Sequence, residues 1–117
     1  MMEDTTTTPQ LDPDTMARHS AEAARFLRAI ANDSRLMVLC RLVEGEQSVG
    51  QLQARVPLSQ SALSQHLAVL RREGLVATRR ESQNIYYSLD DERARQVLPV
   101  LYEMFCRNCH EEALTEG

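Results

Sequence analysis

Thiols are the side chains of this sequence with the broadest chemistry. The chain contains Cys40, Cys106 and Cys109, and His110 follows the last of them directly. Thiolates are nucleophiles and ligands for soft metals, so this set could form a redox switch or a metal site. Residues 106–110 also match the short C-x-x-C-H run of c-type haem attachment. Cys40 shares a helix face with apolar residues, which is typical of a small buried hydrophobe.

A second set of side chains is suited to reading DNA. Leu63, Leu67 and Leu70 form one apolar stripe at helical spacing. Another face of the same segment carries serine, glutamine and alanine, and only its end is charged. Serine and glutamine can pair with base edges, and alanine permits close approach in a major groove. The plainer interpretation of this face is a polar surface helix.

The preceding residues predict that this segment is the second helix of a helix-turn-helix. Ser48 and Gln51 have the spacing of a capping box at the start of a short helix. Pro57 ends that helix, because the residue before a proline disfavours helical geometry. Ser59 then caps the reading helix. Two short helices with a tight turn form a helix-turn-helix, whose second helix enters the DNA groove.

The residues that follow predict a β-hairpin wing. Gly74 stops the reading helix, and residues 76–80 and 85–89 alternate as two strands around a polar turn. Arg79 and Arg80 lie near the tip of that hairpin, where they would meet phosphate or the minor groove. The expected DNA contacts are Ser59, Gln60, Ser61, Ser64, Gln65, His66, Arg71, Arg72, Arg79 and Arg80. For His66, packing beside the leucine stripe is an equal alternative.

Further helices frame the helix-turn-helix. Asp14 can cap a first helix, and Asn32 or Asp33 can cap a second one. Asp90 can cap a last helix, in which Pro99 either bends the axis or begins a new segment. The predicted fold is therefore mainly α with a β-hairpin wing, a winged helix-turn-helix.

Length and composition agree with a single domain of 117 residues. The polar residues 1–13 are expected to be a disordered tail, residues 14–110 the domain and residues 111–117 a C-terminal tail. No apolar run approaches the length of a membrane span, and the first residues lack the basic and apolar parts of a secretory signal. We therefore expect a cytoplasmic protein without a membrane partner. No Walker loop, Ser-His-Asp signature or H-E-x-x-H run suggests an enzyme.

The charge distribution is compatible with DNA binding although the net charge is −4. Residues 55–87 contain five arginines and two glutamates, a local charge of +3, so the rest of the chain carries −7. Affinity for DNA depends on the charge close to phosphate. A basic face on an acidic body can therefore bind a duplex.

The sequence resembles a known family. The run LSQSALSQHLAVLRREGLV, followed by TRRESQNIYYSL, is similar to the winged-helix signature of ArsR/SmtB-type repressors. The run LRAIANDSRLMVLCRLVEGEQSVGQL is similar to the stretch that precedes it in the same family, so the resemblance covers roughly residues 16–106. Ser34 departs from the pattern, since many members have proline there. The resemblance implies a DNA-binding repressor of double-stranded operator DNA and a homodimer formed through the first and last helices.

The sequence around two cysteines is similar to one branch of that family, the persulfide- and polysulfide-sensing repressors of BigR and SqrR type. Cys40 lies in RLMVLCRLVEGEQSVGQL and Cys106 in LYEMFC. The resemblance implies that reactive sulfur joins these two thiols through a disulfide or a longer sulfur chain, and that the cross-linked dimer releases its operator. Cys109 has no counterpart in the pattern and is either a spectator or a resolving thiol.

Two alternatives stay open at this point. Cys40, Cys106, Cys109 and His110 could instead hold a soft metal or respond to haem. The Cys-x-Cys metal run of many relatives is absent from residues 48–52, and we expect no resident metal or cofactor. A c-type haem carrier is a remote alternative, because it would need export and would leave the winged helix unexplained.

Overall fold

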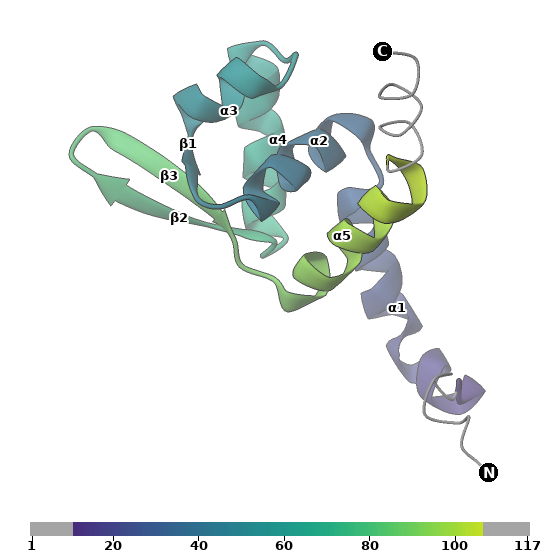
Figure 1. The fold of residues 1–117 in the computed structure, drawn as a ribbon. Helices are drawn as coiled ribbons and strands as arrows, with labels where there is room; N and C mark the ends of the chain where they lie inside the picture. The colour runs from purple at the N-terminus through teal and green to yellow at the C-terminus, as the bar shows by residue number, and fades with distance from the viewer. Residues whose placement is uncertain (1–10, 107–117) are drawn as a thin grey trace, which may run out of the picture.

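The computed structural model describes residues 11–106, which form helices around a small antiparallel sheet (Figure 1). The predictions on residues 1–10, Cys109, His110 and 111–117 lie outside this range. The elements in chain order are α1 (Pro13–Ile30), α2 (Asp33–Val43), β1 (Gln47–Ser48), α3 (Val49–Arg55), α4 (Gln60–Arg72), β2 (Val76–Glu81), β3 (Asn84–Leu89) and α5 (Glu92–Phe105).

Polar caps begin the helices of the helix-turn-helix where the sequence predicts them. Ser48 and Gln51 form the capping box: the Gln51 N–H donates to Ser48 Oγ at 3.1 Å, and the Ser48 N–H donates to Gln51 Oε1 at 2.8 Å. Asn32 and Ser59 each accept a hydrogen bond from the backbone N–H three residues on. These local bonds fix the starts of α2, α3 and α4.

Two predicted caps are wrong by one or two positions. The cap of α1 is Asp12 and not Asp14, because Pro13 occupies the first turn, where its missing N–H costs nothing. The cap of α5 is Asp91 and not Asp90. The Asp90 N–H donates to the carbonyl of Leu75, so this residue belongs to the end of the sheet.

The wing is the β2–β3 hairpin, and both strands extend one residue further than predicted. The sheet order is β1-β3-β2, with Arg79 opposite Tyr86 and Gln47 opposite Tyr87. Gly74 has φ of +78°, which favours glycine, and it ends α4 as predicted. The sequence did not reveal β1, because two residues are too few to show alternation.

The core lies where α2 packs against α4, α5 and β3. The predicted stripe on α4 is confirmed, because Leu63, Leu67 and Leu70 are buried. Burying a leucine side chain contributes about 1.5–3 kcal/mol, so this stripe fixes which face of α4 points outward. The other large, fully buried side chains are Leu39, Leu52, Leu75, Leu98 and Val38.

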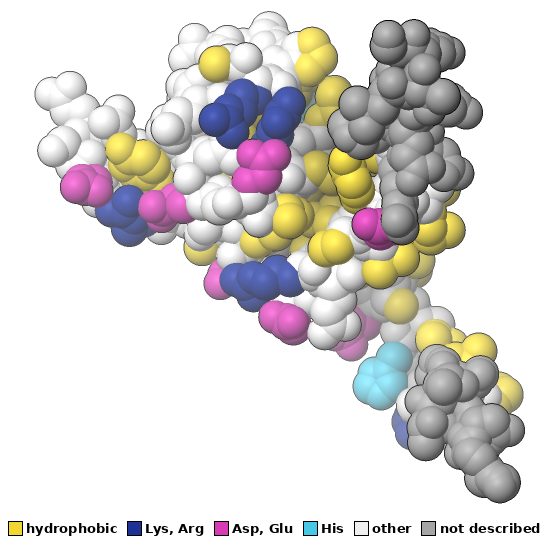
Figure 2. Space-filling model, in the orientation of Figure 1, with side chains coloured by type: hydrophobic (Ala, Val, Ile, Leu, Met, Phe, Trp, Pro, Cys, Tyr) yellow, Lys and Arg dark blue, Asp and Glu magenta, His cyan; other side chains and the backbone are white. Residues whose placement is uncertain are grey.

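Helices α1 and α5 carry apolar side chains that the chain itself leaves exposed. Leu27 of α1 and Val100, Tyr102 and Met104 of α5 are each at least half exposed. Figure 2 shows hydrophobic side chains gathered over α5. Pro99 lies inside a continuous α5, which neither breaks nor restarts there. None of the helices in residues 11–106 is both long and apolar enough to cross a membrane.

Candidate nucleic-acid interface and thiol pair

Helix α4 presents its predicted polar face to the outside of the molecule. Ser61, Ser64 and Gln65 are exposed, and the small side chain of Ala68 continues this face one helical turn further on. Gln60 and Ser59 at the start of the helix are also exposed. The leucine stripe on the opposite side holds this face away from the core, as a reading helix requires.

Ser59 and His66 are placed differently from the other predicted contacts. Ser59 Oγ accepts the Ala62 N–H at 3.1 Å and lies 3.5 Å from Ser61 Oγ, so its hydroxyl caps α4 and already has partners within the helix. His66 is half-buried, between the exposed face and the leucine stripe. This position leaves part of the imidazole accessible, and a contact of His66 with DNA stays a prediction.

A concave surface follows the exposed face of α4. This hollow has a volume of about 420 Å³ and is bounded by α4, the start of α3 and strand β3. Its α4 lining ends in two arginines, so positive charge lies at its rim. The lining residues are Val49, Ser64, Leu67, Ala68, Arg71, Arg72 and Tyr87.

The four arginines predicted to meet phosphate fall into two groups. Arg71 and Arg80 are exposed and form no ion pair with any residue from 11 to 106, and Arg72 only approaches Glu73 at 3.9 Å. Arg79 instead forms salt bridges of 2.8 Å with both Glu46 and Glu81. Arg71, Arg72 and Arg80 can therefore contact phosphate without breaking a strong ion pair, whereas Arg79 would have to break its salt bridges first.

The two predicted switch thiols lie on neighbouring helices. Cys40 of α2 is half-buried against the core, and Cys106 at the end of α5 is exposed. Helices α2 and α5 pack together. Burial raises the pKa of Cys40, charge on Cys106 raises it further, and the cation of Arg41 opposes this by a smaller amount. Burial therefore outweighs the effect of the neighbouring Arg41 cation.

Charge on Cys106 contributes to the raised pKa of Cys40, and the helices that lead to the two thiols pack against each other. Both thiols are free. Residues 11–106 contain no group of three histidine, cysteine or acidic side chains that could hold a metal ion. Among the described residues, the chemistry available here is that of two thiols, one exposed and one half-buried.

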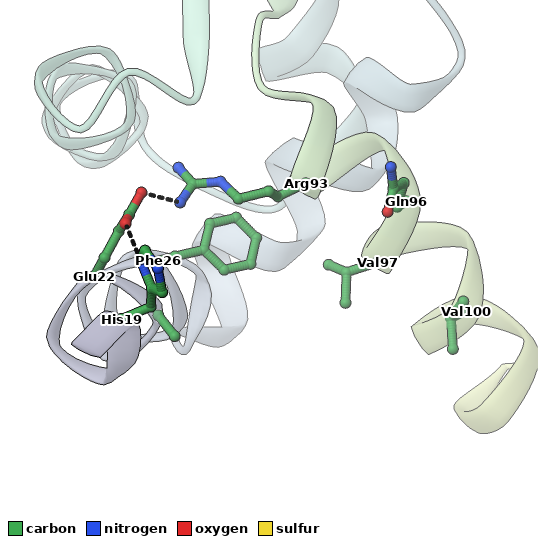
Figure 3. A pocket seen from close by; sticks show the side chains of 8 residues that line it. His19, Glu22, Phe26, Arg93, Gln96, Val97 and Val100 are labelled. Carbon is green, nitrogen blue, oxygen red and sulfur yellow. Dashed lines mark ion pairs between the residues drawn. The ribbon is translucent and has the colours of Figure 1, made fainter. Parts of the chain in front are cut away.

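A second hollow, of about 640 Å³, separates α1 from α5 (Figure 3). Arg93 of α5 reaches across it: its guanidinium lies 3.6 Å from Glu22 and 4.8 Å from the ring centre of Phe26. The same guanidinium binds Asp91 at 2.7 Å and lowers the pKa of that carboxyl. Arg93 therefore ties the two helices with exposed apolar faces to one another.

Several contacts around the site had no signal in the sequence. Glu46 binds Arg79 from 33 positions away, and Glu73 at the end of α4 binds Arg25 of α1 at 2.7 Å. Neither pair has helical or strand spacing. Gln47 is buried, and its side-chain amide donates to the carbonyl of Arg41. Only the fold brings these partners together.

Comparison with known proteins decides the family. The family model described as bacterial regulatory protein, arsR family, matches residues 32–78. The transcriptional activator HlyU of Vibrio cholerae is 48% identical over 92 residues, which cover 79% of this chain and 85% of that protein. This chain belongs to the ArsR family. The biofilm growth-associated repressor of Xylella fastidiosa is 41% identical over 100 residues, 86% of this chain and 88% of that protein.

Solved structures agree with this assignment. The crystal structure of the repressor BigR from Xylella fastidiosa has a TM-score of 0.78 at 41% identity, covering 82% of this chain and 98% of that one. The structure of reduced HlyU from Vibrio cholerae has a TM-score of 0.75 at 47% identity, covering 80% and 98%. This ArsR-family chain is therefore a winged helix-turn-helix, DNA-binding transcriptional regulator. The relatives described above are named as a transcriptional activator and as repressors.

Proposed function

We propose that this ArsR-family chain is a homodimeric repressor that releases its operator when reactive sulfur joins Cys40 to Cys106. The observation that carries the proposal is the placement of these thiols, one exposed and one half-buried, on two helices that pack together, where charge on Cys106 raises the pKa of Cys40. A cross-link between them would tie α2, which belongs to the core, to the end of α5.

Exposure suggests which thiol reacts first. The exposed Cys106 thiolate attacks the outer sulfur of a persulfide RSSH, becomes a persulfide itself and expels RS⁻. The Cys40 thiolate then attacks Cys106 Sγ, forms the disulfide and expels HS⁻. Two thiols are oxidised and the transferred sulfur is reduced to sulfide, so the electrons balance. A second RSSH, attacked by the Cys106 persulfide before closure, adds one sulfur to the bridge.

The exposed apolar faces of α1 and α5 support a dimer through these helices. Leu27, Val100 and Tyr102 remain at least half exposed in the single chain, and exposed apolar patches mark interfaces. Another ArsR-type structure, a Mycobacterium bovis domain 28% identical to this chain, is described as homodimeric. Association would place two α4 helices on one side of a duplex, with half-sites about 10–10.5 base pairs apart.

The dimer links the thiols to DNA. A cross-link at the end of α5 changes or restricts the helix that would form the dimer face, and with it the spacing of the two reading helices. Operator affinity falls only if the cross-linked shape fits the duplex less well than the reduced shape does. The names of the relatives favour regulation of this kind: one is a repressor, and another was solved explicitly as reduced HlyU.

Titration of the chain against DNA from its own upstream region tests the proposal. Under reducing conditions we expect salt-sensitive binding, followed by release when a persulfide donor is added and recovery when a thiol reductant is added. A chelator should change nothing. Absence of salt-sensitive binding would contradict the repressor proposal, whereas release by low micromolar soft metal without an oxidant would favour a metal sensor.

A further inference from the structure

Each nitrogen of the Arg79 guanidinium donates to a carboxylate within the protein, although the side chain is half exposed. Its Nε and Nη2 donate to the two carboxylate oxygens of Glu46 at 2.9 and 2.8 Å, and its Nη1 donates to Glu81 at 2.8 Å. All three nitrogens therefore have carboxylate partners. The two-pronged contact with Glu46 is the geometry in which arginine and carboxylate bind best.

One flat face of this guanidinium also contacts an aromatic ring. The Arg79 Cζ lies 4.8 Å from the ring centre of Tyr86, its cross-strand partner on β3. The bonds to Glu46 and Glu81 raise the pKa of Arg79, and Arg79 lowers the pKa of Glu46. Two carboxylates surround one cation, so this part of the wing has no surplus positive charge to offer phosphate. Figure 2 shows basic and acidic side chains side by side on the wing.

The Arg79–Glu46 pair joins two parts of the fold that the backbone leaves apart. Strand β2 is at the edge of the sheet and pairs only with β3 among the described strands. Glu46 lies on the other side of β3, directly before β1. The next residue, Gln47, is buried and holds the carbonyl of Arg41 at the end of α2. The pair thus ties the free edge of the wing to the body.

Arg80 is the natural comparison. It follows Arg79 on β2, so strand alternation points its side chain to the opposite face of the hairpin. It is exposed, and no carboxylate from residue 11 to residue 106 pairs with it. Arg80 can therefore approach phosphate without breaking an ion pair, whereas Arg79 would have to give up Glu46.

We propose that Arg79 is a positioning residue of the DNA interface, which fixes the wing against Glu46 and leaves the phosphate contact on the wing to Arg80. This inference differs from the prediction from sequence that both arginines meet DNA. It rests on DNA binding by the chain and is independent of the thiol switch.

Salt dependence separates the two roles, because each phosphate contact contributes about 0.9 to the slope of log affinity against log salt. The reduced protein would be titrated with its upstream DNA across a range of salt for Glu46→Gln, Arg79→Gln, their double variant and Arg80→Gln. We expect Arg80→Gln to lower the slope by about 0.9. Arg79→Gln and Glu46→Gln should each weaken binding about three- to tenfold with an unchanged slope. The double variant should bind no worse than either single variant.

The opposite pattern would overturn the proposal. If Arg79 were a phosphate contact restrained by Glu46, Glu46→Gln would tighten binding and raise the slope, and Arg79→Gln would lower it. Wild-type binding by both single variants would also overturn it, because the pair would then position nothing. Failure of the wild-type chain to bind DNA would instead contradict the proposed function as a whole.

Reversal of the pair gives a second, independent readout. Glu46→Arg and Arg79→Glu would each place like charges together and should weaken binding, with retained folding checked by thermal denaturation. The combined reversal restores an ion pair of opposite orientation and should recover much of the lost affinity. If Arg79 itself touched phosphate, the reversal would leave glutamate facing DNA, and no recovery would follow.

Discussion

Replacement of Cys40 and Cys106, the two proposed switch thiols, by serine should separate the effect of packing from the effect of thiol chemistry. Cys40 is half-buried against the core and Cys106 is exposed. A buried hydroxyl without a partner costs about 1–3 kcal/mol, so half burial at Cys40 should cost about 1 kcal/mol. Exposure at Cys106 should keep the cost within about 0.5 kcal/mol. Domains have about 5–15 kcal/mol of stability, so both variants should fold.

Denaturant titration of the reduced proteins measures these costs, and thermal melting should show a drop of about 4 °C for Cys40→Ser alone. Both variants should bind DNA when reduced and should fail to release it with a persulfide donor, because a cross-link needs both sulfurs. Cys109→Ser should still respond. Wild-type stability in Cys40→Ser would refute the packing account. A response that survives in Cys106→Ser but disappears in Cys109→Ser would refute the pairing.

Three further predictions concern DNA contact, capping and pH. Gln65→Ala should reduce the binding free energy for the operator by about 1–3 kcal/mol and relax base preference. Arg72→Ala should weaken binding to all sequences alike and lower the slope of log affinity against log salt by about 0.9. Fluorescence anisotropy titrations with operator and scrambled duplexes distinguish the two effects. Ser48→Ala removes half of a capping box and should cost about 1 kcal/mol in denaturant titration. Burial raises the pKa of Cys40, so closure of the cross-link from a Cys106 persulfide should accelerate as pH rises towards that pKa. The rate of closure is measured by quenching the reaction at set times and determining the mass of the intact protein. The sheltered neutral thiol stabilises the fold below its ordinary pKa, and this contribution should be lost as pH rises through the raised value.

The helix-turn-helix and the wing could be predicted because their signals are local. A capping box at Ser48, a proline after α3 and a glycine after α4 each act within a few residues of where they stand. The caps of α1 and α5 were misplaced because several aspartates lie near each start. Pro13 and the backbone bond of Asp90 decide between them, and the second of these exists only in the folded chain.

The roles of individual arginines could not be predicted in the same way. Arg79 and Arg80 are adjacent and chemically identical in the sequence, and the fold alone brings Glu46 to one of them. The same holds for Arg25 and Glu73, which are far apart along the chain. Long-range ion pairs leave no periodic pattern in the sequence. The net charge counted over residues 55–87 therefore overstates the positive charge that is available to DNA.

Peptide mapping of the protein that a persulfide donor has released from DNA tests the central claim most directly. Cleavage after Arg41 and Arg107 separates the peptides of Cys40, Cys106 and Cys109. The proposal predicts one new species, in which the Cys40 and Cys106 peptides are joined by a disulfide or by a bridge with added sulfur, and which a reductant separates as DNA binding returns. Release with Cys40 and Cys106 both unmodified, or with Cys40 joined to Cys109, would contradict it.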